Sequence, residues 1–340
     1  MAKLVKLADI AAIMNVSTVT VSKALSDQKG VSEEMREKIK KLADEMGYKS
    51  PSAIKGMRAH KSYNIGVVVS ERYFERYDSF YWKMYQEVAT KAVQKECFTM
   101  LEVLSVEDEE ELELPKLLKE EKADGLIIIG VLNDNYLCML EEKTKIPLIY
   151  LDFCDRRHEY DAVITDNYYG MYKLTNYLFD QGHTQIAYVG KLLCTGSITD
   201  RYFGYAKALL EHGQPVNEEW VLSDRDENSY KASNGYKITL PEKMPTAFAC
   251  NCDMVACELI SILQKKGYRV PEDISVVGFD NYLTPGRSNI GITTYEVDVK
   301  EMTRKAINSL IKKMSGEHYK QGISIVEGRM VIKDSVKKLS

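Results

Sequence analysis

Hydrophobic residues near the start of the chain recur every three or four positions, and this spacing predicts a short helix. The residues that would share its buried face are Leu7, Ile10, Ala11 and Met14. The stripe stops at Asn15, a residue type that tolerates the left-handed backbone conformation found just after helices. We therefore expect the first helix to end there.

The next segment, VSTVTVSKALSDQKGVSEE (16–34), begins like a strand, because β-branched and hydroxyl residues alternate. A strand would have no partner in the first sixty residues, whereas a helix would have both a cap and a buried face. Ser17 is a good N-cap. Val21, Ala24 and Leu25 then repeat at helical spacing. The residues left facing outward are Thr18, Val19, Ser22 and Lys23.

A third helix begins after Ser32, and the acidic Glu33 and Glu34 suit the positive end of its dipole. Its apolar stripe comprises Met35, Ile39, Leu42, Ala43 and Met46. Two helices joined by a tight turn, the second presenting hydroxyls and a lysine, are typical of a helix-turn-helix that enters the DNA major groove. Hydroxyls bind phosphates there, and a lysine reaches guanine O6 and N7.

The charge distribution favours the same partner. The formal net charge of the chain is −4, but residues 1–62 contain twelve Lys and Arg against seven Asp and Glu. The remaining residues contain 34 basic and 43 acidic side chains, so a module of charge +5 precedes a body of charge −9. Nucleic acid is the commonest partner of a small basic module.

Beyond residue 62, short continuous apolar runs alternate with helical stretches. The apolar runs are 64–70, 98–103, 125–130, 147–152, 185–190, 246–250 and 274–280. The helical stretches include 80–96, 168–181, 201–212 and 252–266. Strands that are apolar on both faces belong to parallel sheets covered by helices, so we expect a doubly wound α/β body. Ligands in such folds gather at the carboxyl ends of the strands.

Polar side chains stand at several of those ends. Ser70, Asp152 and Asp280 each follow an apolar strand, and Arg201 begins a helical stretch. Carboxylates and a guanidinium that converge can bind vicinal hydroxyls in pairs, which predicts a polyol site.

Aromatic residues are dense just after the first strand of the body, and a pyranose ring stacks well on such rings. The candidates closest to the strand end are Tyr73, Phe74 and Phe80. The alternative is that aromatic side chains in this segment anchor a helix to the sheet or to a second subunit.

Size and composition fit a cytoplasmic protein with a large core, because 45% of the 340 residues are hydrophobic. The longest apolar runs, such as 125–132, are well below the ~20 residues that a membrane span needs, and no signal peptide is evident. Seven cysteines, odd in number, argue against a disulfide framework. The run CNCDMVAC (250–257) lacks the paired spacing of zinc sites, so we expect no metal.

The segment LADIAAIMNVSTVTVSKALSDQKGVSEEMREKIKKLADEMGY (7–48) resembles the headpiece of the lactose-repressor (LacI/GalR) family of bacterial transcription regulators, in order and spacing throughout. The resemblance makes residues 1–48 a DNA-binding headpiece. It also implies that Thr18, Val19 and Lys23 read bases. Around them, Thr20 and Ser22 would hold phosphates, and Ser17 belongs to the same DNA-binding set.

Residues 49–62, KSPSAIKGMRAHKS, have the composition of a linker, with no acid and four basic residues. In the resembling family this hinge becomes a short helix that wedges an apolar side chain into the minor groove. Met57 occupies that position, beside Ile54 and Arg58. Because Gly56 weakens a helix by ~1 kcal/mol, we do not expect the hinge to fold without DNA.

Residues 162–190, 200–213 and 270–281 resemble the effector domain of the same family, a two-lobed fold similar to periplasmic sugar-binding proteins of type I. The resemblance implies that residues 63–340 bind a small-molecule effector and form a dimer. The expected lobes are approximately 63–165 with 294–321, and 166–293 with 322–340.

The resemblance also places Ser70, Asp152, Arg201 and Asp280 where the family contacts its effector, most often a sugar. Residues 252–256, CDMVA, occupy the place of the family's usual NDxxA. Cys252 therefore replaces an asparagine that commonly bonds the ligand, whereas Asp253 is retained.

Together these features predict a transcriptional regulator, most simply a repressor, whose operator affinity is controlled by a carbohydrate effector. Two headpieces related by a twofold axis read a pseudo-palindromic operator, so we expect a homodimer. The alternatives are a sugar-binding protein, or an enzyme acting on a sugar or nucleotide with an accessory basic domain. Because the chain has no P-loop, no GxGxxG after a strand and no GxSxG elbow, we expect no enzyme activity and no cofactor. The short apolar runs likewise predict no membrane partner.

Overall fold

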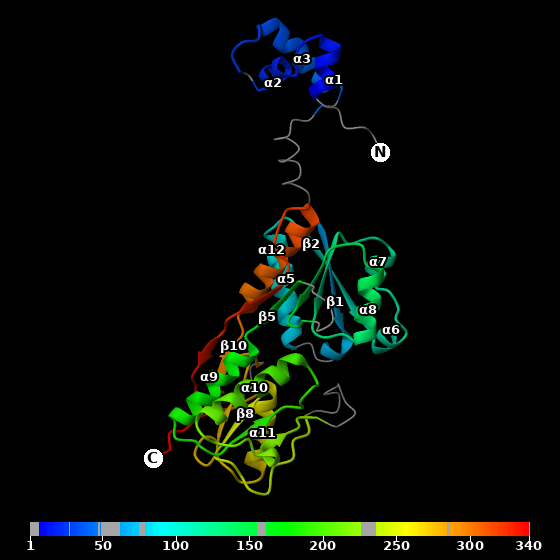
Figure 1. Ribbon diagram of the computed structural model, residues 1–340. Helices are drawn as coiled ribbons and strands as arrows, with labels where there is room; N and C mark the ends of the chain where they lie inside the picture. The colour runs from blue at the N-terminus through cyan, green and yellow to red at the C-terminus, as the bar shows by residue number, and fades with distance from the viewer. Residues whose placement is uncertain are drawn as a thin grey trace. The chain divides into compact units, whose positions relative to one another are not determined.

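The structure is a computed structural model that describes residues 7–26, 28–46, 48, 62–74, 79–154, 161–225, 236–283 and 286–339. The chain divides into two units, Met1–Lys61 and Ser62–Ser340, which we call the headpiece unit and the body (Figure 1). Of the helices described, none is long and apolar enough to cross a membrane.

The described part of the headpiece unit folds as three short helices, as the hydrophobic spacing predicts. They are α1 (Leu7–Met14), α2 (Thr18–Leu25) and α3 (Glu33–Glu45). The first helix ends where expected, because Asn15 adopts a positive φ of 50°. The side chains buried between the three helices are Ile10, Ala11, Val21, Ala24, Ile39 and Ala43. A strand at the start of 16–34 is therefore excluded.

The body contains two parallel sheets and a small antiparallel pair (Figure 1). The larger sheet has the order β11-β5-β4-β3-β1-β2, with strands β11 (Ile323–Val326), β5 (Asp161–Thr165), β4 (Leu148–Leu151), β3 (Gly125–Ile129), β1 (Asn64–Ser70) and β2 (Phe98–Leu104). The smaller sheet has the order β7-β6-β8-β9, with β7 (Val221–Leu222), β6 (Ile186–Val189), β8 (Ala247–Cys250) and β9 (Ser275–Val277). Two further strands, β10 (Thr294–Glu296) and β12 (Arg329–Val331), pair with each other.

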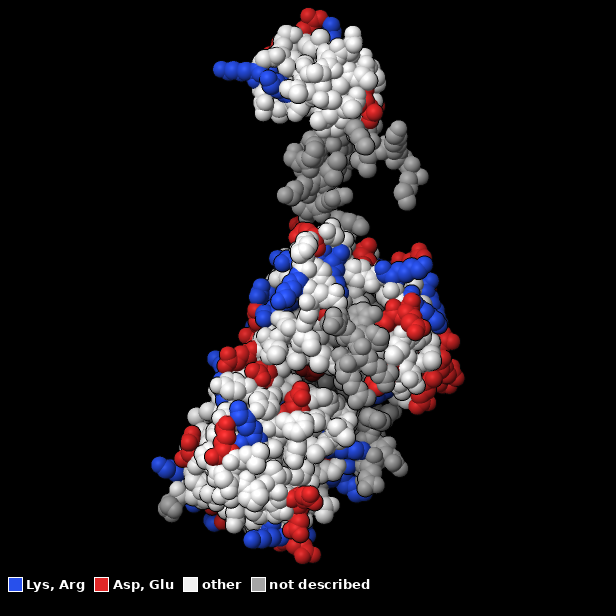
Figure 2. All heavy atoms as spheres, in the orientation of Figure 1, with Lys and Arg blue, Asp and Glu red and all other residues white. Residues whose placement is uncertain are grey.

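Helices complete two lobes, one around each sheet. The first lobe has α5 (Phe80–Val93), α6 (Val106–Glu110), α7 (Lys116–Lys119), α8 (Asp134–Lys143) and α12 (Val299–Ser315), with the short helix η1 (Glu71–Tyr73). The second lobe has α9 (Asn167–Asp180), α10 (Gly196–Glu211) and α11 (Asp253–Lys265), with η2 (Glu218–Trp220). Acidic side chains gather over the edge of the first lobe that carries α6 to α8 (Figure 2).

Strand β1 explains why the first sheet is covered on both faces. Val67 and Val69 belong to the core shared with α5, whereas Val68, which points to the other face, packs in a cluster with Tyr136 and Leu140 of α8. A strand that is apolar at every position must bury both of its faces. All seven predicted strands are present, and each forms part of one of the two parallel sheets.

The chain passes between the lobes three times, at Asp166, at residues 297–298 and at residues 327–328. At two of these passages, the chain changes lobe at a different residue from the one expected. Residues 294–296 were expected in the first lobe, but Thr293 bridges to Val277 beside the second sheet. Strand β11 was expected in the second lobe, but it pairs with β5 of the first sheet. Both strands are so short that their sequence does not indicate which sheet they join.

Candidate DNA-binding and effector sites

The outer face of α2 presents the side chains that the sequence assigned to DNA. Val21 and Ala24 are fully buried, so the opposite face of the helix is turned to solvent. The exposed residues on and just before the helix are Ser17, Thr18, Val19, Ser22 and Lys23, while Thr20 is half-buried. Val19 is 60% exposed, so an apolar side chain stands among the polar ones on this face.

Ser17 has a structural role that the sequence also indicates. Its hydroxyl accepts a hydrogen bond from the backbone N–H of Thr20 at 3.0 Å and so caps α2. The hydroxyl of Thr20 lies 2.8 Å from the same oxygen. These two side chains therefore fix the start of the helix whose other residues face outward. The expected hinge residues Ile54, Met57 and Arg58 lie outside the described residues.

In the body, Arg201 is the centre of a buried polar cluster between the two lobes. Its Nε donates to Asn167 Oδ1 at 2.8 Å, and its Nη1 donates to the backbone carbonyl of Asn251 at 2.6 Å. Its Nη2 forms an ion pair with Asp280 Oδ1 at 3.1 Å. The guanidinium also lies over the ring of Phe279, 3.8 Å from the centroid. Every nitrogen of Arg201 thus has a partner.

Asp152 enters this cluster from the first lobe, at the carboxyl end of β4. Its backbone has a positive φ of 71°, which is uncommon for a residue other than glycine. Burial, with a smaller contribution from nearby Asp280, outweighs the lowering effects of Arg201 and of a hydrogen bond from Tyr81, so the pKa of its carboxyl group is raised to about 7. Asp152 Oδ1 is buried and has no hydrogen-bond partner among the described residues.

Asp280 and Arg201 each shift the pKa of the other. Burial raises the pKa of Asp280 above its ordinary value, although the adjacent Arg201 acts to lower it. Burial acts to lower the pKa of Arg201, but the Asp280 and Asp152 carboxylates raise it. The arginine therefore stays charged between two carboxyl groups, whereas Asp152 binds a proton more readily than an exposed acid does.

Two predicted contacts have other partners in the structure. Ser70 is fully buried, and its hydroxyl accepts from Arg72 Nε at 3.0 Å. Arg72 in turn forms an ion pair of 2.7 Å with the buried Glu109. Asp253 accepts from the backbone N–H of Tyr282 at 3.0 Å, and it holds the loop that carries Asp280.

Asp253 and its neighbour Cys252 are both enclosed. Burial raises the pKa of Asp253 to about 8 and that of Cys252 to about 12. A Cβ at Gly278 would lie 2.1 Å from Asp253 Oδ1, so only glycine allows this close approach. Cys252 precedes α11 as its N-cap without a side-chain hydrogen bond, which is a role that asparagine would fill better.

Aromatic side chains line the first-lobe side of the cluster. Tyr73 and Tyr81 have ring centroids 4.4 Å apart. Phe80 meets Tyr282 of the second lobe edge-on, with centroids 5.9 Å apart. Phe74 packs against Trp82 rather than another ring of the cluster. Of the three aromatic candidates, Phe80 therefore contacts the second lobe, and Tyr73 packs on Tyr81, whose hydroxyl donates to Asp152.

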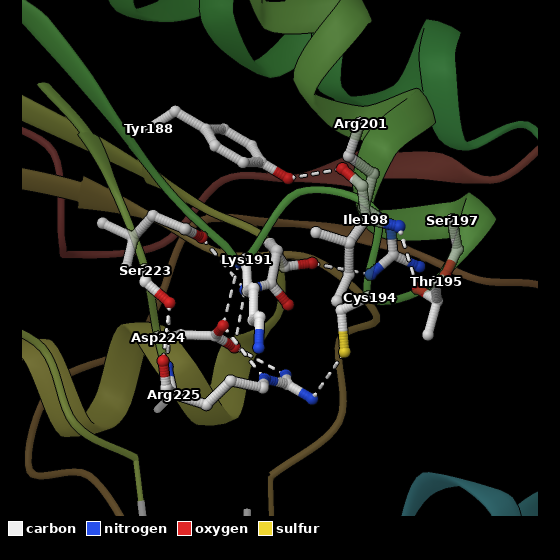
Figure 3. A network of polar contacts seen from close by, with 12 residues as sticks. Tyr188, Lys191, Cys194, Thr195, Ser197, Ile198, Arg201, Ser223, Asp224 and Arg225 are labelled. Carbon is white, nitrogen blue, oxygen red and sulfur yellow. Dashed lines mark hydrogen bonds and ion pairs between the residues drawn. The ribbon is translucent and has the colours of Figure 1, made fainter. Parts of the chain in front are cut away.

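Further polar contacts are linked to Arg201 through Asn251, whose carbonyl accepts from Arg201 and whose side chain donates to Asp224 (Figure 3). Asp224 is fully buried and accepts from the backbone N–H of Lys191 at 2.9 Å and from Asn251 Nδ2 at 3.2 Å. Arg225 binds the same carboxylate through two nitrogens, at 3.0 and 2.6 Å. Burial acts against ionisation, but Arg225 and these hydrogen bonds hold the pKa of Asp224 below its usual range.

Sequence reasoning missed Asn167, Asn251, Asp224 and Tyr81. Asn251 was visible as a polar residue directly after an apolar strand, the same signal that identified Asp152. Asn167 follows β5, which was not predicted as a strand, so its position carried no such signal. Within the described part of the chain, no group of three or more His, Cys, Asp and Glu side chains could hold a metal ion.

His183 of the second lobe is a structural residue. It is buried, and its ring nitrogens lie 3.0 Å from Thr246 Oγ1 and 3.0 Å from the carbonyl of Lys337. Both nitrogens are therefore engaged with neighbouring elements of the second lobe.

Comparisons with known proteins agree with this division of the chain. Residues 6–51 match the model of bacterial regulatory proteins of the lacI family, and residues 175–336 match the periplasmic binding protein-like domain. The HTH-type transcriptional repressor PurR of Vibrio campbellii is 27% identical over 338 residues, which is 98% of each chain. The protein of the same name from Aliivibrio salmonicida is 26% identical over 333 residues, 97% of this chain and 98% of that one.

Solved structures share the fold over nearly the whole chain. The transcriptional regulator CelR in complex with cellobiose superposes with a TM-score of 0.68 at 21% identity, covering 97% of this chain and 99% of that one. The lac repressor dimer bound to operator and the anti-inducer ONPF gives a TM-score of 0.64 at 23% identity, covering 98% and 100%. The predicted combination of a helix-turn-helix with a two-lobed α/β domain is confirmed.

Proposed function

This chain belongs to the lacI family of bacterial regulatory proteins and is a DNA-binding transcriptional repressor, and we propose that a small molecule held at the Arg201 cluster controls its affinity for DNA. The observation that carries the DNA-binding role is the division of α2 into two faces. Its apolar side is buried, and its hydroxyls and amine are exposed. Membership in a family of repressors also speaks against the enzyme alternative.

In this proposal α2 lies in the major groove. The small exposed residues Thr18 and Val19 let the helix approach the base edges, and Lys23 reaches guanine O6 and N7. The hydroxyl of Ser22 and the N-terminal end of the helix contact phosphates. The hinge residues Ile54, Met57 and Arg58 are proposed to follow the minor groove, as in the resembling family.

Effector binding acts on DNA affinity through the angle between the lobes. Asp152 belongs to the first lobe, whereas Arg201 and Asp280 belong to the second, so a ligand bound to Asp152 and to the second-lobe side of the cluster pulls on both lobes. The lobes are joined by three short passages, which permit a hinge motion. A ligand that binds one lobe angle better than another shifts the population toward it by its differential binding free energy.

We further propose that the effector belongs to the carbohydrates. Carboxylates accept hydrogen bonds from vicinal hydroxyls, and the Tyr73 and Tyr81 rings offer an apolar surface to a sugar ring. The similar regulator CelR is solved in complex with cellobiose, which supports the same class of ligand.

The proposed assembly is a homodimer that reads a pseudo-palindromic operator. Strand β2 is an edge of the first sheet, and its Phe98 and Val103 remain 65% and 43% exposed. Val93, at the end of α5, is exposed as well. Apolar residues on an open sheet edge need cover, and a second copy of the chain supplies it.

Selection of bound fragments from a random DNA pool, at two salt concentrations, tests the function. We expect one enriched pseudo-palindromic site and a steep loss of affinity with salt, because phosphate contacts release counterions. Binding without sequence preference would contradict the proposal and favour a sugar-binding protein with an accessory basic domain.

A further inference from the structure

Asp152 of the Arg201 cluster is a buried carboxyl group to which no basic side chain of the described residues is bound, and this indicates the chemistry of the ligand. Resting on the function proposed above, we propose that the effector is a hydroxylated small molecule that carries a protonated amine, which binds at Asp152 between the lobes. A neutral sugar would fill the hydroxyl contacts but would leave this carboxyl group without a basic partner.

Arg201, the basic group that acts on Asp152, is engaged by other partners. Its guanidinium is held entirely by second-lobe partners, namely Asn167, the Asn251 carbonyl and Asp280. Asp152 approaches the same cation from the first lobe but forms no hydrogen bond or ion pair with it among the contacts described. Lys83 also acts on Asp280, but Arg201 is the basic group that acts on Asp152, and its hydrogen bonds are already taken.

The free oxygen of Asp152 is the point at which a ligand would bind. The residue is 7% exposed, and its Oδ1 is buried without a hydrogen-bond partner among the described residues. Leaving a buried acceptor unsatisfied costs about 1–3 kcal/mol, more for a charged group. The positive φ of 71° shows that the surrounding fold holds Asp152 in this place despite its strain.

The aromatic side chains near Asp152 favour a cation over a second hydroxyl. The Tyr81 hydroxyl donates to Asp152, and its ring is packed against Tyr73 with a centroid separation of 4.4 Å. Phe80 and Tyr282 close the adjacent contact between the lobes. Aromatic faces attract organic cations, and rings beside a carboxylate form the usual cage for an ammonium group.

Without a ligand, a proton can take the place of the amine. The charged and titratable groups that act on Asp152 are Tyr81 of α5, Arg201 of α10 and Asp280 after β9, and Tyr73 of η1 senses it as well. Burial and Asp280 favour the protonated acid, against the effect of Arg201 and of the Tyr81 hydrogen bond. An arriving ammonium would displace this proton, so binding should release protons at neutral pH.

The test uses the full chain and pairs of sugars that differ only in the amine. Glucosamine is compared with glucose, galactosamine with galactose, and the β-1,4-linked dimer of glucosamine with cellobiose, by thermal shift and titration calorimetry. We expect the amine-bearing member of at least one pair to bind about tenfold or more tightly, because a charge-assisted hydrogen bond is roughly twice as strong as a neutral one. Calorimetry in two buffers of different ionisation enthalpy should show proton release.

Two variants separate the possible outcomes. Asp152→Asn should abolish the preference for the amine, whereas the exposed Asp180→Asn should retain it. Equal or tighter binding of the neutral sugars, no binding of any amine, or a preference that survives in Asp152→Asn would each overturn the inference. Operator binding is measured in the same samples. A neutral sugar that alone shifts operator affinity refutes the amine but not the regulator, whereas DNA binding without sequence preference refutes the proposed function.

Discussion

Replacing Asp152 by asparagine should stabilise the ligand-free body, and more so as the pH rises. The asparagine has the shape of the protonated acid and keeps an oxygen for the Tyr81 hydroxyl, but it cannot ionise. In the wild type, burial raises the pKa of Asp152 from 3.8 to about 7. A raised pKa of an acid means that the folded state holds a proton that the unfolded state releases, so the wild type loses stability as the pH rises from about 4 to about 7.

The size of the gain follows from the same two values. One pKa unit corresponds to about 1.4 kcal/mol, so the wild type loses at most about 4 kcal/mol above about pH 8. At about pH 5.5 the loss is about 2 kcal/mol, because half of the interval between the two pKa values has been crossed. The advantage of Asp152→Asn should therefore grow by about 2 kcal/mol between about pH 5.5 and pH 8.5.

Urea denaturation of the full chain measures this difference. The chain has two tryptophans, Trp82 and Trp220, and both belong to the body, so their fluorescence follows the unfolding of the body alone. Asp180→Asn, at an exposed position at the end of α9, is the matched control and should show no such growth with pH. A variant no more stable than the wild type at high pH, or a gain that is the same at both pH values, would refute the reasoning.

Three further predictions concern the headpiece and the assembly. Lys23→Ala should weaken operator binding by about 1–3 kcal/mol and relax the preference at one base pair in a binding-site selection, whereas the control Lys38→Ala on α3 should do neither. An equal loss of affinity on all sequences would instead make Lys23 a phosphate contact. Ser17→Ala should destabilise α2 by about 1 kcal/mol, seen as faster hydrogen exchange of its first amides, and unchanged exchange would contradict the cap. Phe98→Glu should convert the dimer to a monomer in analytical ultracentrifugation. Leu210→Glu changes a similarly exposed residue of α10 and should leave the protein dimeric. A dimeric Phe98→Glu protein would show that the dimer interface lies elsewhere.

The sequence predicted most fully those parts whose structure depends on local spacing. The three headpiece helices and the cap at Ser17 follow from a period and a residue type, and both are present. Arg201 and Asp280 form a direct ion pair, which the rule about strand ends could only suggest. That rule says where side chains gather but not which of them face a ligand.

The remaining features depend on contacts between segments far apart in the chain. Ser70 follows a strand as expected, yet its hydroxyl is taken by Arg72, which no local pattern reveals. Asp253 accepts a hydrogen bond from the backbone of Tyr282, which no local pattern reveals either. Strand β11 joins the first sheet because β5 offers it an open edge, and a run of four residues does not encode that choice.

Asn167 gives the passages between the lobes a further consequence. It is the first residue of α9, directly after the passage at Asp166, and it accepts a hydrogen bond from Arg201. Asp280, the other side-chain partner of Arg201, bridges to Glu296, which directly precedes the passage at residues 297–298. The Arg201 guanidinium is thus bound beside two of the three passages between the lobes. A displacement of a fraction of an ångström at that point is magnified with distance from the axis, so the ends of the lobes would travel farthest while the Arg201 cluster itself barely moves.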